Sequence, residues 1–369
     1  MNILFICKRY YTNKDVIRDQ YGRLYELPIQ LAKLGHQITV LCLDYKNCDP
    51  LENFVESFGN GSVHWMILSF QRIFTLNVLK VYRELKQQLF DEVIGSSDIP
   101  CIWLTKKLAH RLRIPYGVDL YDNYESFGQA KIPGFRRILK NCVRQSDLVI
   151  VVSTMLKDKV ISDYHYTGAV HIMSNGIRPE VFLRGDKLSA RKHLGLPLDV
   201  VLMGTAGGLS EMKGLDIVYE AWNILKNQNQ NLYLVLAGKI DKNLPVPIDS
   251  HAIYLGELKE KEIGLLFQAL DIGIISAHDS EFGKYCFPQK MYEMVASELP
   301  IVAAKLGAMD ELLSIYPEML FRCGDMESLV ETLIFQLDNK LLSNLEVLYW
   351  LELVAKLEPS LESLQRLSD

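Results

Sequence analysis

The order of apolar runs in the first fifty residues restricts the fold more than any other feature of the chain. Residues 2–7 form a short apolar run, residues 21–34 carry a helical pattern that ends at Gly35, and residues 37–43 form a second apolar run. Strand, loop, helix and strand in this order make a βαβ unit, whose two strands lie parallel in one sheet. The sequence therefore predicts an α/β fold whose ligands bind beyond the carboxyl ends of the strands.

The same alternation of strand-like and helical patterns continues to the end of the chain. The strand-like runs are 63–68, 92–95, 116–120, 147–153, 171–174, 200–205, 232–238, 253–255, 271–276 and 301–304, and the helical patterns include 75–90, 100–112, 186–194, 215–226, 261–270 and 341–364. Ser153 is expected to cap a helix, and residues 278–286 are expected to form a loop. Since 369 residues exceed one ordinary core, we expect two domains, 1–178 and 179–345, followed by a helical segment at 346–369.

Composition and charge exclude several classes of protein. A net charge of −5 gives no sign of nucleic-acid binding, and no run of eighteen apolar residues predicts a transmembrane helix. The chain starts directly with a strand-like run, so we expect no signal peptide. Seven cysteines, without CxxC or HExxH spacing, indicate reduced thiols in a cytoplasmic protein and no zinc site.

Residues 287–311 contain the candidate site that carries most of the functional interpretation. Pro288 suits the first turn of a helix, and Lys290 and Glu293 share one face of that helix. A helix start attracts phosphate through its unpaired N–H groups, and a lysine there adds a full charge. Lys290 is then a candidate phosphate ligand and Glu293 a candidate ribose ligand of a nucleoside diphosphate. The alternative is an ordinary surface ion pair between these two side chains.

A glycine-rich segment between a strand and a helix is a second candidate for phosphate binding. It reads A-G-G-L-S-E-M-K-G over residues 206–214, where Gly207 and Gly208 allow a ligand to approach the backbone closely. Lys213 stands near the start of the next helix. A merely solvated lysine is disfavoured there, because the helix dipole would prefer an acidic residue.

The first half of the chain offers candidate acceptor-side residues at two strand ends. Gly22 and Arg23 begin the first helix, and Arg23 either faces a ligand or is a solvated helix residue. Asp122 and Tyr124 follow the strand-like run 116–120. Asp122 is a candidate for orienting or deprotonating an acceptor hydroxyl, and the alternative is that it only caps the next helix.

Residues 131–144 mix basic and apolar side chains in a helical pattern. Such a basic amphipathic segment suits contact with a membrane surface. The alternative is a helix with a solvated basic face and a buried apolar face.

Several of these motifs together resemble one known family. They are L-A-K-L-G-H-Q-I-T-V in the first domain, N-G-I-x-x-x-x-F at its end, K-G at residues 213–214, and P-x-K-x-x-E followed by L-P-I-V-A and G-x-x-x-E. This set resembles the GT-B glycosyltransferases, specifically the retaining, family-four-like group. The resemblance implies two Rossmann-like domains that face each other across a cleft, with a C-terminal helix crossing back to the first domain.

The resemblance also implies roles for individual residues of the second domain. Lys213 and Lys290 would hold the pyrophosphate, and the main chain near Leu258 would meet the nucleobase. Glu293 falls on the second glutamate of the family's E-x7-E motif, whereas Tyr285 stands in place of the first. Gly208 stands where the family usually has an arginine.

These observations predict a hexosyltransferase that moves a sugar from a nucleotide-sugar donor to a glycan or lipid-linked acceptor, as in polysaccharide biosynthesis. Similar enzymes retain the donor's configuration, and the absence of a DxD motif agrees with a reaction without metal or other cofactor. We expect a cytoplasmic location with peripheral contact to the inner face of the membrane. The alternatives are a non-catalytic GT-B scaffold or partner protein, and a nucleotide-sugar epimerase or a phosphorylase on the same fold.

Overall fold

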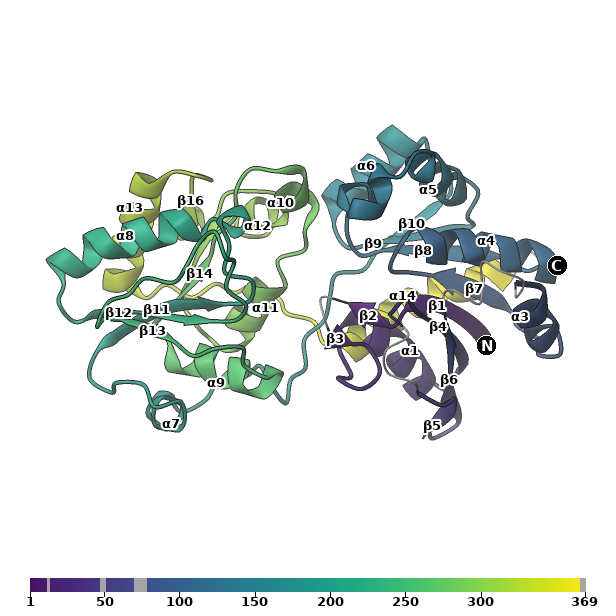
Figure 1. Ribbon diagram of the computed structural model, residues 1–369, viewed down its shortest axis with the longest axis horizontal. Coiled ribbons are helices and arrows are strands. Elements are labelled where there is room, and N and C mark those ends of the chain that lie inside the picture. Colours follow the sequence, from purple (N-terminus) through teal and green to yellow (C-terminus); the bar gives the residue numbers. More distant parts are fainter. Residues whose placement is uncertain (12–13, 47–50, 70–77, 366–369) are drawn as a thin grey trace. The chain divides into compact units, whose positions relative to one another are not determined.

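The computed structural model describes residues 1–11, 14–46, 51–69 and 78–365 (Figure 1). The chain forms two compact units, each built on its own sheet. Unit 1 comprises Met1–Gly176 and Trp350–Asp369, and unit 2 comprises Ile177–Tyr349. The expected α/β fold with two Rossmann-like domains is confirmed. The domain boundaries expected from the sequence lie after residues 178 and 345, and they stay predictions.

Unit 1 contains an eight-stranded sheet in the order β10-β9-β8-β7-β1-β4-β6-β5. Seven of these strands run parallel, and β5 pairs antiparallel with β6. The expectation of a purely parallel sheet is therefore wrong at this edge. A small hairpin of β2 and β3 follows β1. The bounds are β1 (Asn2–Lys8), β2 (Tyr10–Tyr11), β3 (Lys14–Asp15), β4 (Gln37–Asp44), β5 (Phe54–Phe58), β6 (Gly61–Ser69), β7 (Glu92–Gly95), β8 (Tyr116–Leu120), β9 (Leu148–Val151) and β10 (Ala169–Ile172).

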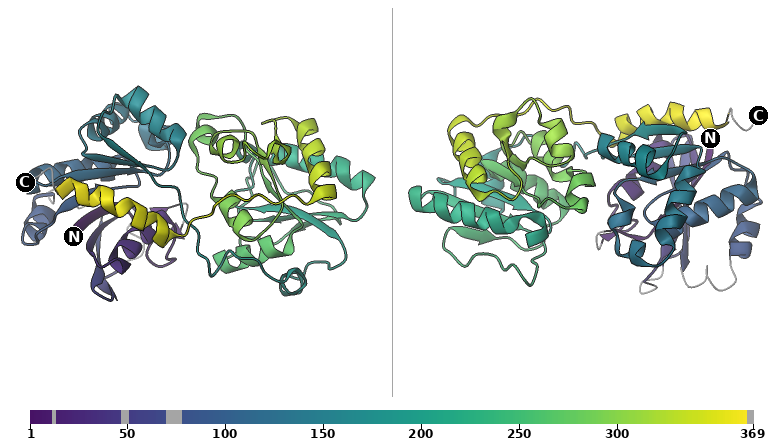
Figure 2. Two further views of the ribbon diagram at one scale, coloured as in Figure 1. Left: turned by 180° about the vertical axis from the view of Figure 1, so that it is seen from behind. Right: turned by 90° about the horizontal axis from the view of Figure 1, so that it is seen from above.

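Helices cover both faces of this sheet. They are α1 (Arg23–Lys33), α3 (Val78–Leu85), α4 (Ile99–Leu112), α5 (Phe135–Arg144), α6 (Thr154–Tyr164) and α14 (Trp350–Gln365). The C-terminal helix α14 packs against α1 and β9, so its expected return to the first domain is confirmed (Figure 2). Ser153 accepts a hydrogen bond from the Leu156 main-chain N–H and caps α6, as expected.

Two helix predictions need correction or restriction. The expected helix at 75–90 begins with three residues that lie outside the described part of the chain, and the observed α3 ends at Leu85. The expected helix at 341–364 begins only at Trp350. The preceding stretch is extended because its main chain pairs elsewhere: the Leu348 carbonyl accepts a hydrogen bond from Ile177 N at 3.4 Å.

Unit 2 contains a six-stranded, wholly parallel sheet in the order β13-β12-β11-β14-β15-β16. Its strands are β11 (Val201–Ala206), β12 (Leu232–Ala237), β13 (Ala252–Tyr254), β14 (Ile272–Ile275), β15 (Ile301–Ala304) and β16 (Leu320–Phe321). The interiors of β11, β12, β14 and β15 are buried, whereas the edge strand β13 is only half-buried, and each buried Leu, Ile or Val contributes about 1.5–3 kcal/mol to stability.

The helices of unit 2 lie on both faces of its sheet (Figure 1). They are α7 (Lys187–His193), α8 (Leu215–Gln228), α9 (Glu260–Ala269), α10 (Glu281–Tyr285), α11 (Gln289–Ala296), α12 (Ala308–Leu312) and α13 (Met326–Asn339). The loop expected at 278–286 contains the short helix α10. Its first turn is held by Ser280, whose hydroxyl accepts from Gly283 N and whose carbonyl accepts from Lys284 N.

Candidate functional site

The direction of the chain changes at strand β11 of unit 2. From β11 the chain passes through α8 to β12 on one side, whereas β14 pairs with β11 on the other side. In open parallel sheets, ligands bind at the carboxyl ends of the two strands beside such a switch point. The loops that follow β11 and β14 are residues 207–214 and 276–288; Lys213 lies in the first, and Lys290 follows the second at the start of α11.

Gly207 and Gly238 shape the loop after β11. Both have left-handed φ values, +115° and +120°, and a Cβ atom on Gly238 would lie 1.9 Å from the Gly207 carbonyl oxygen. The two backbones are therefore in contact, which only glycine permits here. By contrast, a Cβ atom on Gly208 would have no described atom within 4 Å. The loop is thus anchored on one side and open at Gly208, where a ligand can approach the main chain.

Lys290 lies directly beside this loop. Its Nζ donates to Thr205 Oγ1 at 3.4 Å and lies 3.8 Å from the position of a Cβ atom on Gly207. Burial, followed by repulsion from Lys213, lowers the pKa of Lys290 to about 8. The structure therefore brings the two predicted lysines together at the switch point, although they are far apart in the sequence.

Glu293 lies one turn after Lys290 on α11 but forms no ion pair with it. Among the described residues, no carboxylate lies within 4.0 Å of Lys290 Nζ, so the alternative of a surface ion pair is wrong. Burial, with a smaller contribution from the nearby Glu260, raises the pKa of Glu293 to about 8, against a hydrogen bond with Gln289 and the charge of Lys290. A carboxyl group with this pKa is largely protonated at neutral pH, so it can both donate to and accept from ligand hydroxyls.

The start of α8 is fixed to the loop after β14. Ser276 Oγ donates to the Lys213 carbonyl at 2.7 Å, and His278 Nε2 lies 3.0 Å from Asp216 Oδ1. A Cβ atom on Gly214, which has a φ of +69°, would lie 3.1 Å from Ala277 N. These contacts hold Lys213 at the switch point from both loops.

Sequence reasoning missed three residues of this site. Thr205 contacts Lys290, Gln289 bonds to Glu293, and Glu260 forms an ion pair with Arg178 at 2.8 Å. Thr205 is the last residue but one of β11, close to the glycine loop, and the rule of strand ends could have selected this position. Glu260 carries no such signal, because its proximity to Glu293 depends on how α9 and α11 pack.

Tyr285 and Leu258 are placed at the same end of the unit 2 sheet. Tyr285 ends α10 and Leu258 lies between β13 and α9, and both side chains are partly exposed. Their contacts with a donor stay predictions.

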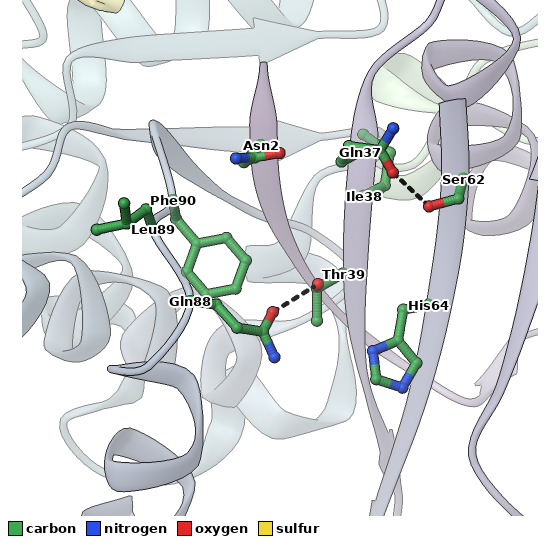
Figure 3. Close-up of a pocket in the computed structure, with 9 residues that line it drawn as sticks. All are labelled: Asn2, Gln37, Ile38, Thr39, Ser62, His64, Gln88, Leu89 and Phe90. Atoms are coloured by element: carbon green, nitrogen blue, oxygen red, sulfur yellow. Dashed lines mark hydrogen bonds between the residues drawn. The ribbon is translucent and has the colours of Figure 1, made fainter. Parts of the chain in front are cut away.

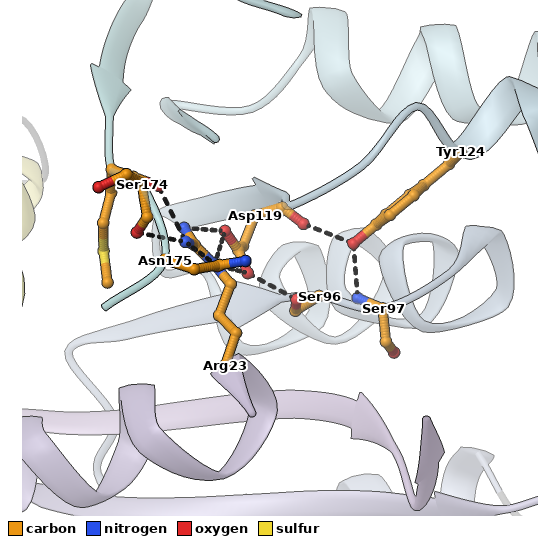
Figure 4. Close-up of polar contacts among 8 residues, drawn as sticks. Arg23, Ser96, Ser97, Asp119, Tyr124, Ser174 and Asn175 are labelled. Carbon is orange, nitrogen blue, oxygen red and sulfur yellow. Dashed lines mark hydrogen bonds and ion pairs between the residues drawn. The ribbon is translucent and has the colours of Figure 1, made fainter. Parts of the chain in front are cut away.

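In unit 1, Arg23 has a different environment from the solvated one considered above. It is 3% exposed, and its guanidinium pairs with Asp119 at 2.8 Å and donates to the carbonyls of Met173 and Ser174 at 2.9 and 3.1 Å (Figure 4). The alternative of a solvated helix residue is therefore wrong. Arg23 joins α1 to β8 and to the segment after β10, and a contact with acceptor stays a prediction.

Tyr124 belongs to the same polar network. Its hydroxyl donates to the Asp119 carbonyl at 3.0 Å and accepts from Ser97 N at 2.9 Å (Figure 4). The side chain is 1% exposed, and burial raises the pKa of its hydroxyl well above the usual range. These contacts position the loop after β7 rather than present the hydroxyl to solvent.

Asp122 does not cap the next helical turn. The cap is Asn123, whose side chain accepts a hydrogen bond from Glu125 N at 3.2 Å, while Asp122 accepts from Asn123 N at 2.7 Å. The capping alternative for Asp122 is therefore wrong, and its role toward an acceptor stays a prediction. Gly22 precedes α1 with a φ of +68°, and no side chain caps that helix.

A separate polar pocket of about 250 Å³ lies at the amino ends of β1, β4 and β6 (Figure 3). Its described lining consists of neutral polar and apolar side chains together with one histidine: Asn2, Gln37, Ile38, Thr39, Ser62, His64, Gln88, Leu89 and Phe90. Because it lies at the opposite ends of these strands, it is not part of the edge that carries the residues above.

Among the described residues, none of the helices is both long and apolar enough to cross a bilayer. No group of three or more His, Cys, Asp or Glu side chains among these residues is arranged to hold a metal ion.

Comparison with known proteins identifies relatives over both units. A model of glycosyltransferase family 4 matches residues 23–181, and a model of the glycosyl transferases group 1 matches residues 200–339. The D-inositol 3-phosphate glycosyltransferase of Stackebrandtia nassauensis is 27% identical over 195 residues, which are 47% of this chain and 43% of that protein. The chain thus matches less than half the length of this relative.

Solved structures show the same fold at low sequence identity. Sucrose-phosphate synthase from Thermosynechococcus elongatus superposes with a TM-score of 0.69 at 16% identity, covering 99% of this chain and 98% of that one. HepE from Anabaena, in complex with UDP and glucose, superposes with a TM-score of 0.70 at 16% identity, covering 98% and 100%. Together with the family models, the two-sheet architecture shows that this chain belongs to the GT-B glycosyltransferases of the family 4 type.

Proposed function

We propose that this protein transfers a hexose from a nucleotide-sugar donor to a glycan or lipid-linked acceptor, with retention of configuration and without a metal ion. The observation that carries the proposal is the convergence of Lys290 and Lys213 beside an open glycine loop at the unit 2 switch point. Structures of HepE with UDP and with UDP-glucose support a nucleotide-sugar donor.

The physical basis is the charge that develops on the leaving diphosphate. As the bond between the anomeric carbon and the diphosphate oxygen breaks, a bond forms from that carbon to the acceptor oxygen, and the acceptor loses its proton. Cations and main-chain N–H groups placed around the diphosphate stabilise its growing charge. A bound diphosphate also raises the pKa of Lys290, because an opposite charge favours the ammonium form.

The chain has only the second of the two glutamates in the family's E-x7-E motif. Tyr285 offers no carboxylate near the donor sugar, so the proposal assigns the ribose contact to Glu293 and keeps Asp122 as the candidate base for the acceptor. Gly208 stands where the family usually has an arginine. Lys213 and Lys290 supply the positive charge that this arginine would otherwise provide.

The test is nucleotide-sugar turnover followed by nuclear magnetic resonance. Lys290→Ala and Lys213→Ala should each abolish most transfer and donor hydrolysis, whereas Lys192→Ala, an exposed lysine of α7, should leave both unchanged. Product with inverted configuration, or activity that disappears on adding EDTA, would contradict the corresponding part of the proposal.

Two outcomes would favour the alternative functions. Conversion of the donor without any acceptor indicates an epimerase. Binding of UDP without hydrolysis or transfer, across a panel of nucleotide sugars and acceptors, indicates a non-catalytic partner protein, which the residues Tyr285 and Gly208 would then explain.

We also propose that segment 131–144 contacts a membrane surface. Its helix α5 buries Leu139, Cys142 and Val143, while Arg136 and Arg137 are exposed and Ile132 is 47% exposed. Basic side chains beside an exposed apolar one suit anionic lipid headgroups.

Vesicle flotation tests this contact. The protein should float with phosphatidylglycerol vesicles and not with phosphatidylcholine vesicles, and the double change Arg136→Gln with Arg137→Gln should abolish flotation. Equal flotation of the double variant would contradict the assignment.

A further inference from the structure

Lys8 stands at the switch point of the unit 1 sheet. It is the last residue of β1, whose neighbours are β4 on one side and β7 on the other. Its main-chain N–H donates to Ser97 Oγ at 2.9 Å, so it lies next to the loop after β7. This is the position at which an open parallel sheet receives its ligand.

Aromatic side chains surround the Lys8 ammonium group. Tyr11, Tyr121, Tyr124 and Phe127 form a chain of ring contacts, which we call the aromatic frame. Successive ring centroids are 5.1, 5.4 and 5.2 Å apart. Lys8 Nζ closes the frame, at 5.6 Å from the Tyr11 centroid and 5.7 Å from that of Phe127. The two central tyrosines are buried, whereas the two end rings are partly exposed.

Lys8 has no anionic partner within the described chain. No carboxylate there lies within 4.0 Å of its Nζ. The adjacent Arg9, by contrast, pairs with Asp15 and Asp44 at 2.7 and 3.1 Å. Asp98, also near this edge, accepts hydrogen bonds from Cys101 N and the Tyr45 hydroxyl. Among the residues that the structure describes, only ring faces balance the positive charge of Lys8, and they are weaker partners than an anion.

Hydrogen bonds hold Ser97 in a strained backbone conformation beside Lys8. Ser97 has a φ of 83°, which costs a residue other than glycine about 1–3 kcal/mol. Three hydrogen bonds maintain it: from Lys8 N to its hydroxyl, from its own N–H to the Tyr124 hydroxyl, and from the Tyr121 hydroxyl to its carbonyl at 3.3 Å. The main chain at Lys8 and the two buried tyrosine rings are thus fixed before any ligand arrives.

Building on the proposed function, we infer that Lys8, Tyr11 and Phe127 form an acceptor subsite for a saccharide that carries a phosphate or carboxylate group. The ammonium pairs with the anionic oxygens, as charge-assisted hydrogen bonds require. The partly exposed ring faces pack on the apolar C–H face of the sugar. A neutral acceptor would give the Lys8 ammonium group no anionic partner.

Binding measurements in the presence of saturating UDP test this inference. The probes are glucose, glucose 6-phosphate, glucuronate and inorganic phosphate, followed by saturation-transfer nuclear magnetic resonance and titration. Glucose 6-phosphate and glucuronate should bind at least about tenfold more tightly than glucose, since one charged hydrogen bond supplies this factor. Lys8→Gln should remove the difference, and the matched variant Lys33→Gln, at the exposed end of α1, should keep it.

Separate outcomes distinguish this inference from the proposed function. Failure of the wild-type protein to bind UDP or any other nucleoside diphosphate would refute the proposed function. With UDP binding intact, equal affinity for glucose and glucose 6-phosphate would refute the acceptor subsite. A loss of UDP affinity in Lys8→Gln would instead make Lys8 a donor contact. Inorganic phosphate binding as tightly as glucose 6-phosphate would refute the role of the rings, as would an unchanged affinity in Phe127→Leu.

Discussion

Replacing Lys290 with alanine should have opposite effects on stability and on ligand binding. The pKa of this lysine falls from 10.5 to about 8 on folding, mainly through burial and secondly through Lys213. At about 1.4 kcal/mol per pKa unit, this corresponds to about 3 kcal/mol against the charged form in the folded protein. Because the folded pKa is the lower one, this destabilisation is fully present at pH 7 and disappears as the pH rises from 8 to 10.5.

The alanine variant loses the buried charge but also the packing of the aliphatic stem against Gly207, where Cδ lies 3.8 Å from the Cβ position. That packing is worth about 1 kcal/mol. Without ligand, the free energy of unfolding of Lys290→Ala should therefore rise by about 1–2 kcal/mol. The affinity for UDP should fall about 10–100-fold, which corresponds to the loss of one charged hydrogen bond.

Calorimetry with and without UDP measures both quantities. The variant should unfold a few degrees above the wild-type Tm, and the rise of Tm on adding UDP should be strongly reduced. Lys290→Met, which keeps the stem, should be more stable than the alanine variant and equally poor in binding UDP. A lower Tm combined with unchanged UDP affinity would refute the reasoning, because Lys290 would then be a structural residue.

Three further predictions concern pH dependence and backbone geometry. The affinity for UDP should fall as the pH rises through about 8, because Lys290 and Glu293 both lose protons there and the site becomes less positive. Titration calorimetry at pH 6.5–9.5 measures this affinity, and an affinity that does not change with pH would contradict the prediction. Burial raises the pKa of Glu92, whose carboxyl oxygens have no hydrogen-bond partner among the described residues, to about 8 from 4.5, so wild-type stability should decline by up to about 5 kcal/mol from pH 4.5 to 8. Glu92→Gln should abolish this decline in denaturant titrations, and an equally steep decline in the variant would show that other groups cause it. Gly238→Ala should destabilise unit 2 by at least about 2 kcal/mol and abolish UDP binding, because its Cβ atom would overlap the Gly207 carbonyl; Gly208→Ala, with open space around it, should fold like the wild type, and equal stability of both variants would contradict the packing argument.

The strands of both sheets could be predicted because most are continuous apolar runs, typical of strands buried on both faces. The strand β5 was missed because its sequence is not a continuous apolar run. Its pattern alternates between half-buried and exposed residues at a sheet edge, and Val55 is 57% exposed. The short helix α10 was missed because Ser280 and the packing of Gly307 against the Lys284 carbonyl determine it, not an apolar period.

Only those parts of the candidate site that follow the ends of parallel strands could be predicted from the sequence. Lys213 and Lys290 follow two strands of one sheet, so a rule about strand ends places them at one edge. The pairing of Arg23 with Asp119, 96 positions apart, follows no such rule. It depends on where the first residue of α1 places its long side chain relative to β8, and for this reason a buried ion pair was mistaken for a surface residue.

Hydrogen–deuterium exchange with saturating UDP tests the central claim most directly, since it locates the bound diphosphate on the chain. The account predicts slower exchange of main-chain amides at residues 205–214 and 286–293, at the carboxyl ends of β11 and β14. Unchanged exchange in both segments with UDP bound, or protection confined to the polar pocket at the amino ends of β1, β4 and β6, would contradict it.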